Sequence, residues 1–160
     1  MKKNVIVSLA DANYFDLLNE LIDSIKRFSE SRNLAICILD AGLKDKQKKI
    51  LLTKVDQIKN AEWDIEVSSL KIRGKEWLKS QVSRAFLPKY FPNYNKYLWI
   101  DADAWVNSWD TIELYFKGCQ NNKLSIATSA DRAYGRVLRA EWFLGSFAKI
   151  KSQNYKHAKS

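Results

Sequence analysis

Short apolar runs alternate with longer amphipathic stretches along this chain, and this alternation restricts its fold more than any other feature. Apolar side chains dominate the runs 5–9, 34–39, 63–67, 96–100 and 124–128. The runs 5–9 and 34–39 lack regular polar alternation, which is typical of strands that are covered on both faces, and the other three runs are short enough to be strands. We therefore predict a strand at each of these positions.

The stretches between the runs carry apolar residues at helical spacing. They predict helices over 14–28, 45–58, 77–86 and 108–116, the third ending at the prolines that follow it. Strands that alternate with helices are typical of a mainly parallel sheet flanked by helices and joined by right-handed crossovers. We predict an α/β, Rossmann-like fold that forms one domain or part of one.

Composition supports one globular unit and gives little sign of secretion. The chain has 160 residues, of which 46% are hydrophobic, which is enough for one buried core. Cys37 and Cys119 lie far apart in dissimilar surroundings, so we expect no disulfide. No run is long enough to span a membrane or to serve as a signal peptide, so we expect a cytoplasmic protein.

The formal net charge of +9 is concentrated near the carboxyl end. Residues 132–160 carry seven basic side chains against one acid, Glu141. This segment is helical in composition but lacks a stop signal, so we expect a truncated chain. The simpler interpretation of its charge is a solvated helix face. The alternative is peripheral attraction to an anionic acceptor or to the inner face of the membrane.

Polar side chains follow three of the predicted strands, at 11–14, 40–42 and 101–103. Sheets of this kind bind ligands beyond the carboxyl ends of their strands. Asp101 and Asp103 are the most informative pair, because residues two apart in extended backbone project to the same side. Two carboxylates aimed at one point suit Mg²⁺ or Mn²⁺. The alternative, that one aspartate caps the next helix and the other faces solvent, stays open.

Four segments in register resemble the retaining glycosyltransferases of family 8, which have the GT-A fold. The resemblance runs from Val5 to about Asp131 and rests on segments 9–14, 39–42, 83–88 and 96–106. It implies that residues 1–131 are the nucleotide-sugar-binding part of a GT-A domain. It also implies that 132–160 leads to an acceptor-binding part that is missing here.

The resemblance also implies roles for individual residues. Tyr14 would stack on uracil, Arg84 would face the diphosphate or sugar, and Asp131 would reach a sugar hydroxyl. Asp101 and Asp103 would hold Mn²⁺ or Mg²⁺. The remaining donor contacts would be made by Ala10, Asp11 and Asn13 at the base and ribose, and by Ala102 at the ribose.

Each role has a simpler alternative, and one expected ligand is missing. Tyr14 could be a core residue, Asp11 a helix cap, and Arg84 the partner of a surface carboxylate. His157, the only histidine, lacks the surroundings of the histidine that completes the family's metal shell. No residue is assigned as a nucleophile.

The function implied is transfer of a sugar from a UDP-sugar to a glycan or lipid-linked acceptor, with retention of configuration, although we expect little turnover by this chain alone. A nucleotidyltransferase is the enzymatic alternative, but residues 8–14 lack the glycine-rich phosphate loop that it needs. A nucleic-acid-binding module would explain the charge, yet the aromatic residues lie within apolar runs, so no nucleic-acid partner is expected. A pseudo-enzyme that binds donor without transfer remains a third alternative.

Overall fold

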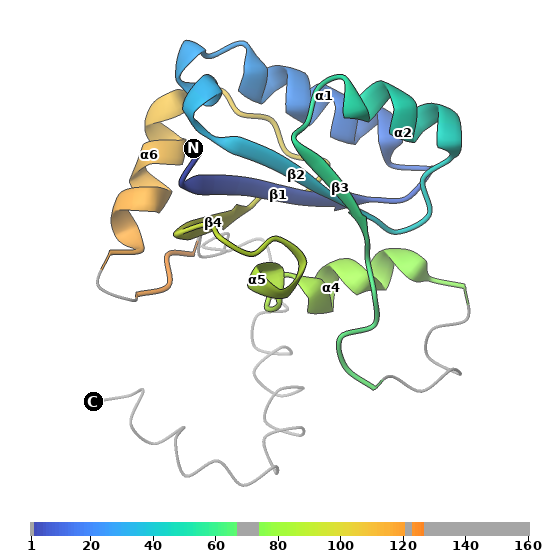
Figure 1. The fold of residues 1–160 in the computed structure, drawn as a ribbon. Coiled ribbons are helices and arrows are strands. Elements are labelled where there is room, and N and C mark those ends of the chain that lie inside the picture. Colours follow the sequence, from blue (N-terminus) through green and yellow to red (C-terminus); the bar gives the residue numbers. More distant parts are fainter. Residues whose placement is uncertain (1, 67–73, 121–122, 127–160) are drawn as a thin grey trace, which may run out of the picture. The chain divides into compact units, whose positions relative to one another are not determined.

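Four strands form one parallel sheet, with helices on both of its faces (Figure 1). The computed structural model describes residues 2–66, 74–120 and 123–126. The strands are β1 (Asn4–Ala10), β2 (Ala35–Asp40), β3 (Gln57–Asn60) and β4 (Lys96–Trp99). All three pairings are parallel, in the order β3-β2-β1-β4. The predicted α/β class with a parallel sheet is confirmed.

The helices divide between the two faces of the sheet. Helices α1 (Phe15–Lys26), α2 (Asp45–Leu52) and α6 (Trp109–Gly118) cover one face. Helices α4 (Lys79–Ser83) and α5 (Leu87–Tyr90) lie on the other. Short 3-10 turns span Ser29–Asn33 and Glu76–Leu78.

Alternate side chains of β1 and β2 supply the cores of both faces. Ile6 and Ile38 pack with the helices α1 and α2, whereas Val7 and Leu39 pack toward Phe91 on the other face. Both strands are buried along almost their whole length. This two-sided burial explains why their sequences are unbroken apolar runs.

The order of the strands reverses between β1 and β4. The chain moves outward from β1 through β2 to β3 and then returns to place β4 on the free side of β1. Loops at the carboxyl ends of the two strands on either side of such a reversal diverge and leave a crevice between them. The segments that follow β1 and β4 are therefore the first place to look for a ligand site.

The third predicted strand and the end of the second predicted helix are wrong. The strand lies at Gln57–Asn60, and 63–66 contains no strand. The helix ends at Leu52 rather than at residue 58. Val55 and Ile58 lie beyond the end of the helix, but both side chains pack against the core. Their burial explains why these positions are apolar.

Two further predictions near the middle and end of the chain need correction. The helix predicted over 77–86 is divided into a 3-10 turn and α4, and Pro88 lies in the first turn of α5 instead of ending a helix. Residues 123–126 form no strand, although one was predicted over 124–128. Asp131, His157 and the basic segment 132–160 lie outside the described residues.

Both cysteines are free thiols, as predicted, and Cys37 is buried in the sheet. Burial raises the pKa of the Cys37 thiol to about 11. Within the described ranges, the structure contains no helix whose length and apolarity would carry it across a membrane.

Candidate functional site

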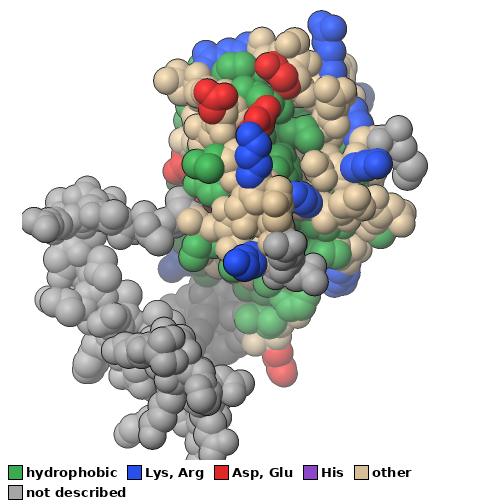
Figure 2. Space-filling model, turned by 90° about the vertical axis from the view of Figure 1, so that its left-hand side faces the viewer, with side chains coloured by type: hydrophobic (Ala, Val, Ile, Leu, Met, Phe, Trp, Pro, Cys, Tyr) green, Lys and Arg blue, Asp and Glu red, His purple; other side chains and the backbone are tan. Residues whose placement is uncertain are grey.

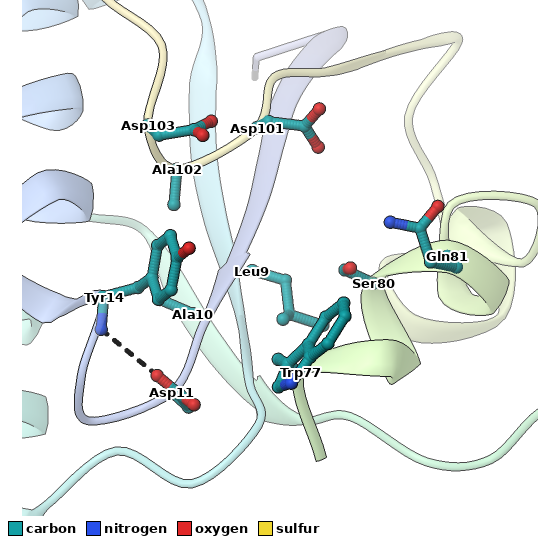
Figure 3. Close-up of a pocket in the computed structure, with 10 residues that line it drawn as sticks. All are labelled: Leu9, Ala10, Asp11, Tyr14, Trp77, Ser80, Gln81, Asp101, Ala102 and Asp103. Carbon is teal, nitrogen blue, oxygen red and sulfur yellow. Dashed lines mark hydrogen bonds between the residues drawn. The ribbon is translucent and has the colours of Figure 1, made fainter. Parts of the chain in front are cut away.

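A cavity of about 450 Å³ opens where β1 and β4 end (Figure 3). We call it the β1–β4 cavity. Its volume falls in the range of roughly 300–1,000 Å³ that is usual for small-molecule sites. Its lining consists of Leu9, Ala10, Asp11, Tyr14, Trp77, Ser80, Gln81, Asp101, Ala102 and Asp103. Six of the predicted site residues are thus brought together at the strand-order reversal.

The loop after β1 is shaped by the carboxylate of Asp11. Its Oδ1 accepts hydrogen bonds from the backbone N–H groups of Asn13 at 2.9 Å and Tyr14 at 3.1 Å. Asp11 therefore closes the turn that precedes α1 and faces the cavity, but it is not the helix cap of the simpler interpretation, because the N-cap is Tyr14 and has no side-chain cap bond. Tyr14 is 46% exposed and lines the cavity, so it is not a core residue.

The loop after β2 braces the loop after β1. Asp40 is buried, and its Oδ1 accepts bonds from the N–H groups of Gly42 at 2.7 Å and Leu43 at 2.6 Å. The carbonyl of Gly42 in turn accepts from the N–H of Ala12 at 3.2 Å, and the side chain of Gln47 donates to the carbonyl of Ala12 at 3.0 Å. Residues 40–42 therefore support the site and do not line it.

Asp101 and Asp103 lie in a turn and not in extended backbone. The turn is closed by a bond from the N–H of Ala104 to the carbonyl of Asp101 at 3.0 Å, so the strand-based argument for their common direction is wrong. Both carboxylates nevertheless line the cavity, on either side of the buried Ala102. Neither caps α6, because the hydroxyl of Ser108 accepts the bond from the N–H of Asp110.

One oxygen of Asp101 is held by two neighbours. The indole Nε1 of Trp99 donates to Oδ1 at 2.7 Å, and Nη2 of Arg84 lies 3.3 Å from the same atom. Arg84 also donates from Nε to the carbonyl of Ser80 at 3.0 Å. Its guanidinium lies over the Trp99 ring, 5.2 Å from the centroid. Arg84 pairs with a carboxylate, as its simpler interpretation held, but that carboxylate is a predicted metal ligand.

The other predicted site residues differ in where they lie. Among the described residues, neither Asn13 nor Arg84 belongs to the lining of the cavity. Asn13 is exposed at the turn that Asp11 closes. The structure does not test the predicted role of either residue.

The loop that follows the two aspartates is anchored to α1. Arg27 donates from Nη2 to the carbonyl of Val106 at 2.7 Å, and the hydroxyl of Ser24 accepts from the N–H of Val106 at 3.0 Å. The guanidinium of Arg27 also lies 5.4 Å from the centroid of the Trp105 ring. These contacts hold the backbone after Asp103 against the helix.

The remaining wall of the cavity was not predicted. Trp77, Ser80 and Gln81 come from the 3-10 turn and α4, on the opposite face of the sheet from α1. Trp77 is 46% exposed although it resembles a helix-face core residue in the sequence. No sequence pattern at these positions indicates a ligand, because their place beside the cavity depends on how α4 packs.

A hydrogen-bonded cluster lies on the same face of the sheet as this wall. The hydroxyl of Tyr90 donates to Oδ2 of Asp64 at 2.6 Å, and Lys89 lies 2.9 Å from Oδ1. The Asp64 side chain is only 1% exposed. Burial opposes ionisation, but the bonds from Tyr90 and Lys89 prevail and hold the pKa of Asp64 below its ordinary value. The cluster ties α5 to the segment after β3.

The aspartates that line the cavity have atoms available for a divalent cation. In the described part of the chain, neither Oδ2 of Asp101 nor the carboxylate of Asp103 has a hydrogen-bond or ion-pair partner. Among all the residues that the structure describes, no group of three or more histidine, cysteine or acidic side chains is arranged to hold a metal. Two hard oxygen ligands suit Mg²⁺ or Mn²⁺, which take other ligands from phosphate and water. The donor set therefore fits such an ion.

The sequence matches a family model, and the fold matches solved structures, among them two of the galactosyltransferase LgtC. The family is Glycosyl transferase family 8, over residues 5–154. No curated protein sequence matches the chain. The galactosyltransferase LgtC, solved in complex with donor and acceptor sugar analogs, is 20% identical, with a TM-score of 0.50 over 68% of this chain. An active-site mutant of LgtC is 19% identical, with a TM-score of 0.50 over 69% of this chain.

These likenesses differ in what they show. At such low identity the two structures establish a shared fold, and this chain covers only 41% of each of them. The family match covers nearly all of the sequence and agrees with that fold. The chain therefore belongs to glycosyltransferase family 8.

Proposed function

We propose that this chain forms the donor-binding part of a glycosyltransferase that uses a UDP-sugar and a divalent cation, Mn²⁺ or Mg²⁺. One observation carries the proposal. An exposed aromatic ring, Tyr14, and three carboxylates, those of Asp11, Asp101 and Asp103, line a single cavity at the strand-order reversal. A nucleoside diphosphate with its cation needs three kinds of group in one site: a flat face for the base, acceptors for the ribose hydroxyls, and ligands for the cation.

The β1 side of the cavity supplies the contacts for the nucleoside. Tyr14 offers its exposed ring to the uracil by stacking. Asp11 keeps Oδ2 for a ribose hydroxyl, since its described hydrogen bonds use Oδ1. Ala10 and Ala102 are both buried and small, so the ribose can approach the backbone closely at these positions. Asn13 is exposed beside them and would complete the pocket at its rim.

The β4 side supplies the contacts for the diphosphate. Asp101 and Asp103 would hold the cation, which when bound offsets the negative charge that develops on the leaving diphosphate. We propose that Arg84 exchanges its contact with Asp101 for one with a phosphate oxygen, because a guanidinium forms strong charge-assisted bonds with phosphate. Asp131 is proposed to reach a hydroxyl of the donor sugar.

The proposal for the acceptor and the stereochemistry rests on the family resemblance. We propose a glycan or lipid-linked acceptor and retention of anomeric configuration. LgtC was solved with a donor and an acceptor analog, which supports a two-substrate reaction in this fold. A place at the inner face of the cytoplasmic membrane, contacted through the basic segment 132–160, belongs to the same proposal.

The described part of the face in Figure 2 gives no support to a nucleic-acid-binding module. On the described part of the face in Figure 2, lysine and arginine side chains are separated by acidic, apolar and other groups. A continuous basic surface is the usual footprint of nucleic-acid binding. The net charge outside residues 132–160 is small, since those residues carry most of the +9.

Calorimetric titration of UDP-sugars tests the proposal. The wild-type chain should bind a UDP-sugar in the presence of Mn²⁺, and Asp103→Asn should lose that binding. The control is Glu113→Gln, which removes the same charge from an exposed position on α6. Binding that is independent of Mn²⁺, or that survives Asp103→Asn, would contradict the proposal. Salt-sensitive binding of RNA or DNA without UDP affinity would favour the nucleic-acid alternative.

A further inference from the structure

The indole of Trp99, at the end of β4, contacts the candidate cation site formed by Asp101 and Asp103. We propose that Trp99 is a positioning residue, whose N–H holds Oδ1 of Asp101 so that Oδ2 is presented to the cation. This inference rests on the proposed function, because it assumes that the two aspartates bind a divalent ion.

The contact has the geometry of a strong, directional bond. Nε1 of Trp99 lies 2.7 Å from Oδ1 of Asp101. An indole N–H is a donor only, and bonds from N–H groups to ionised carboxylates are short and roughly twice as strong as neutral ones. The bond therefore favours one orientation of the Asp101 carboxylate.

Trp99 can act as an anchor because its own position is fixed. It is the last residue of β4 and pairs with Val7 of the central strand. It is partly buried and packs against the buried cluster on the α5 face. Arg84 covers the ring, with its guanidinium carbon 5.2 Å from the ring centroid. A group on a packed strand holds its direction better than a group on a loop.

Asp101 needs such an anchor because its surroundings leave it free. It lies two residues beyond the end of β4, in the turn closed by Ala104, and its side chain is 58% exposed. The other described contact, with Arg84, is longer at 3.3 Å and comes from a long, partly exposed side chain. Without Trp99 the carboxylate would sample several rotamers, and a cation would have to select one of them.

The positioning role of Trp99 predicts that the carboxylates of Asp101 and Asp103 differ in how firmly they are oriented before the cation binds. Asp101 is oriented before the ion arrives, with one oxygen engaged and the other without a described partner. Asp103 has no hydrogen bond or ion pair among the described residues and can adjust to the ion. Hydrogen-bond partners of metal ligands typically change metal affinity by about 10–100-fold. Since Trp99 contacts only one oxygen of one of the two ligands, we expect a loss near the lower end of that range.

The test removes the N–H and keeps an aromatic side chain. Mn²⁺ binding in the presence of UDP is followed by the electron paramagnetic resonance signal of free Mn²⁺, for wild type and Trp99→Phe. We expect the Mn²⁺ dissociation constant to rise about ten-fold in Trp99→Phe. The control is Trp109→Phe, which makes the same change in a half-buried ring on α6 and should leave the constant within about two-fold of wild type.

A double-mutant comparison separates positioning from general damage. If Trp99 acts through Asp101, the loss caused by Trp99→Phe should vanish when it is added to Asp101→Asn. Losses that simply add would overturn the inference. Wild-type affinity in Trp99→Phe, with binding still lost in Asp103→Asn, would overturn the positioning role and leave the proposed function standing. Failure of the wild type to bind Mn²⁺ with UDP would overturn both.

A measurement on the unaltered tryptophan covers the case in which Trp99→Phe does not fold. The ¹⁵N-indole resonance of Trp99 should shift in Asp101→Asn, because the carboxylate that accepts its hydrogen bond has lost its charge. It should stay in place in Asp103→Asn. Equal shifts in the two variants, or none in Asp101→Asn, would overturn the inference.

Discussion

Replacing Arg84 with glutamine should change two affinities in opposite directions. The guanidinium lies 3.3 Å from Oδ1 of Asp101, so it competes electrostatically with a cation at the same carboxylate. The two side chains are 37% and 58% exposed, and ion pairs at such positions contribute about 0–1 kcal/mol. Removing the pair should therefore tighten Mn²⁺ binding in the absence of nucleotide by up to about five-fold.

The same substitution should weaken the nucleotide. In the proposed complex Arg84 turns to the diphosphate, and a hydrogen bond to a charged group contributes about 1.5–3 kcal/mol. UDP should therefore bind roughly ten-fold or more weakly to Arg84→Gln at saturating Mn²⁺. Paramagnetic resonance measures the first affinity and calorimetry the second. Arg32→Gln, at an exposed arginine on the Ser29–Asn33 turn, is the matched control.

The two results together decide the reasoning about Arg84. Weakening of both affinities would mean that the substitution damages the site. If neither affinity changes, Arg84 is only a surface partner of Asp101, and its assignment to the diphosphate is wrong.

The remaining predictions concern the supports of the cavity. Gly42→Ala should lower the free energy of unfolding by about 1–3 kcal/mol in denaturant titrations, because φ is +128° at Gly42; an unchanged midpoint would contradict this. Tyr14→Ala should weaken UDP binding by roughly two- to ten-fold through lost stacking, while its 46% exposure should leave thermal stability nearly unchanged. The depressed pKa of Asp64 stabilises the fold above the ordinary carboxyl pKa, and this contribution is lost as the pH falls toward the folded-state pKa. Asp64→Asn should therefore be less stable than wild type near neutral pH and should lose less stability below about pH 4, as thermal unfolding at several pH values can show.

Local sequence predicts the central strands because burial on both faces leaves a clear signature. β1 and β2 differ by about one residue from the predicted runs 5–9 and 34–39. β3 was misplaced because it is an edge strand whose sequence, Gln57–Asn60, has one apolar residue. Nothing in those four residues distinguishes a strand from a loop. The segment is a strand because it pairs in parallel with β2.

The site was predictable where its residues belong to strand ends. Asp11, Tyr14, Asp101 and Asp103 follow apolar runs, so the rule for ligand binding in parallel sheets points to them directly. The contacts that orient Asp101 were not predictable, because they depend on how Arg84 and the turn after β4 are placed in the fold. Trp99 reads as one more apolar strand residue, and its bond to Asp101 depends on the turn that follows.

The central claim is that Asp101 and Asp103 bind a divalent cation that also binds the diphosphate of a nucleoside diphosphate. Crystals of the chain grown with UDP and Mn²⁺, measured at the manganese absorption edge, test it most directly. The account predicts one anomalous peak within about 2.0–2.2 Å of an oxygen from each aspartate and of a diphosphate oxygen, with uracil against Tyr14. Nucleotide bound in the cavity without a peak at the aspartates, or with Asp101 still held only by Trp99 and Arg84, would contradict it.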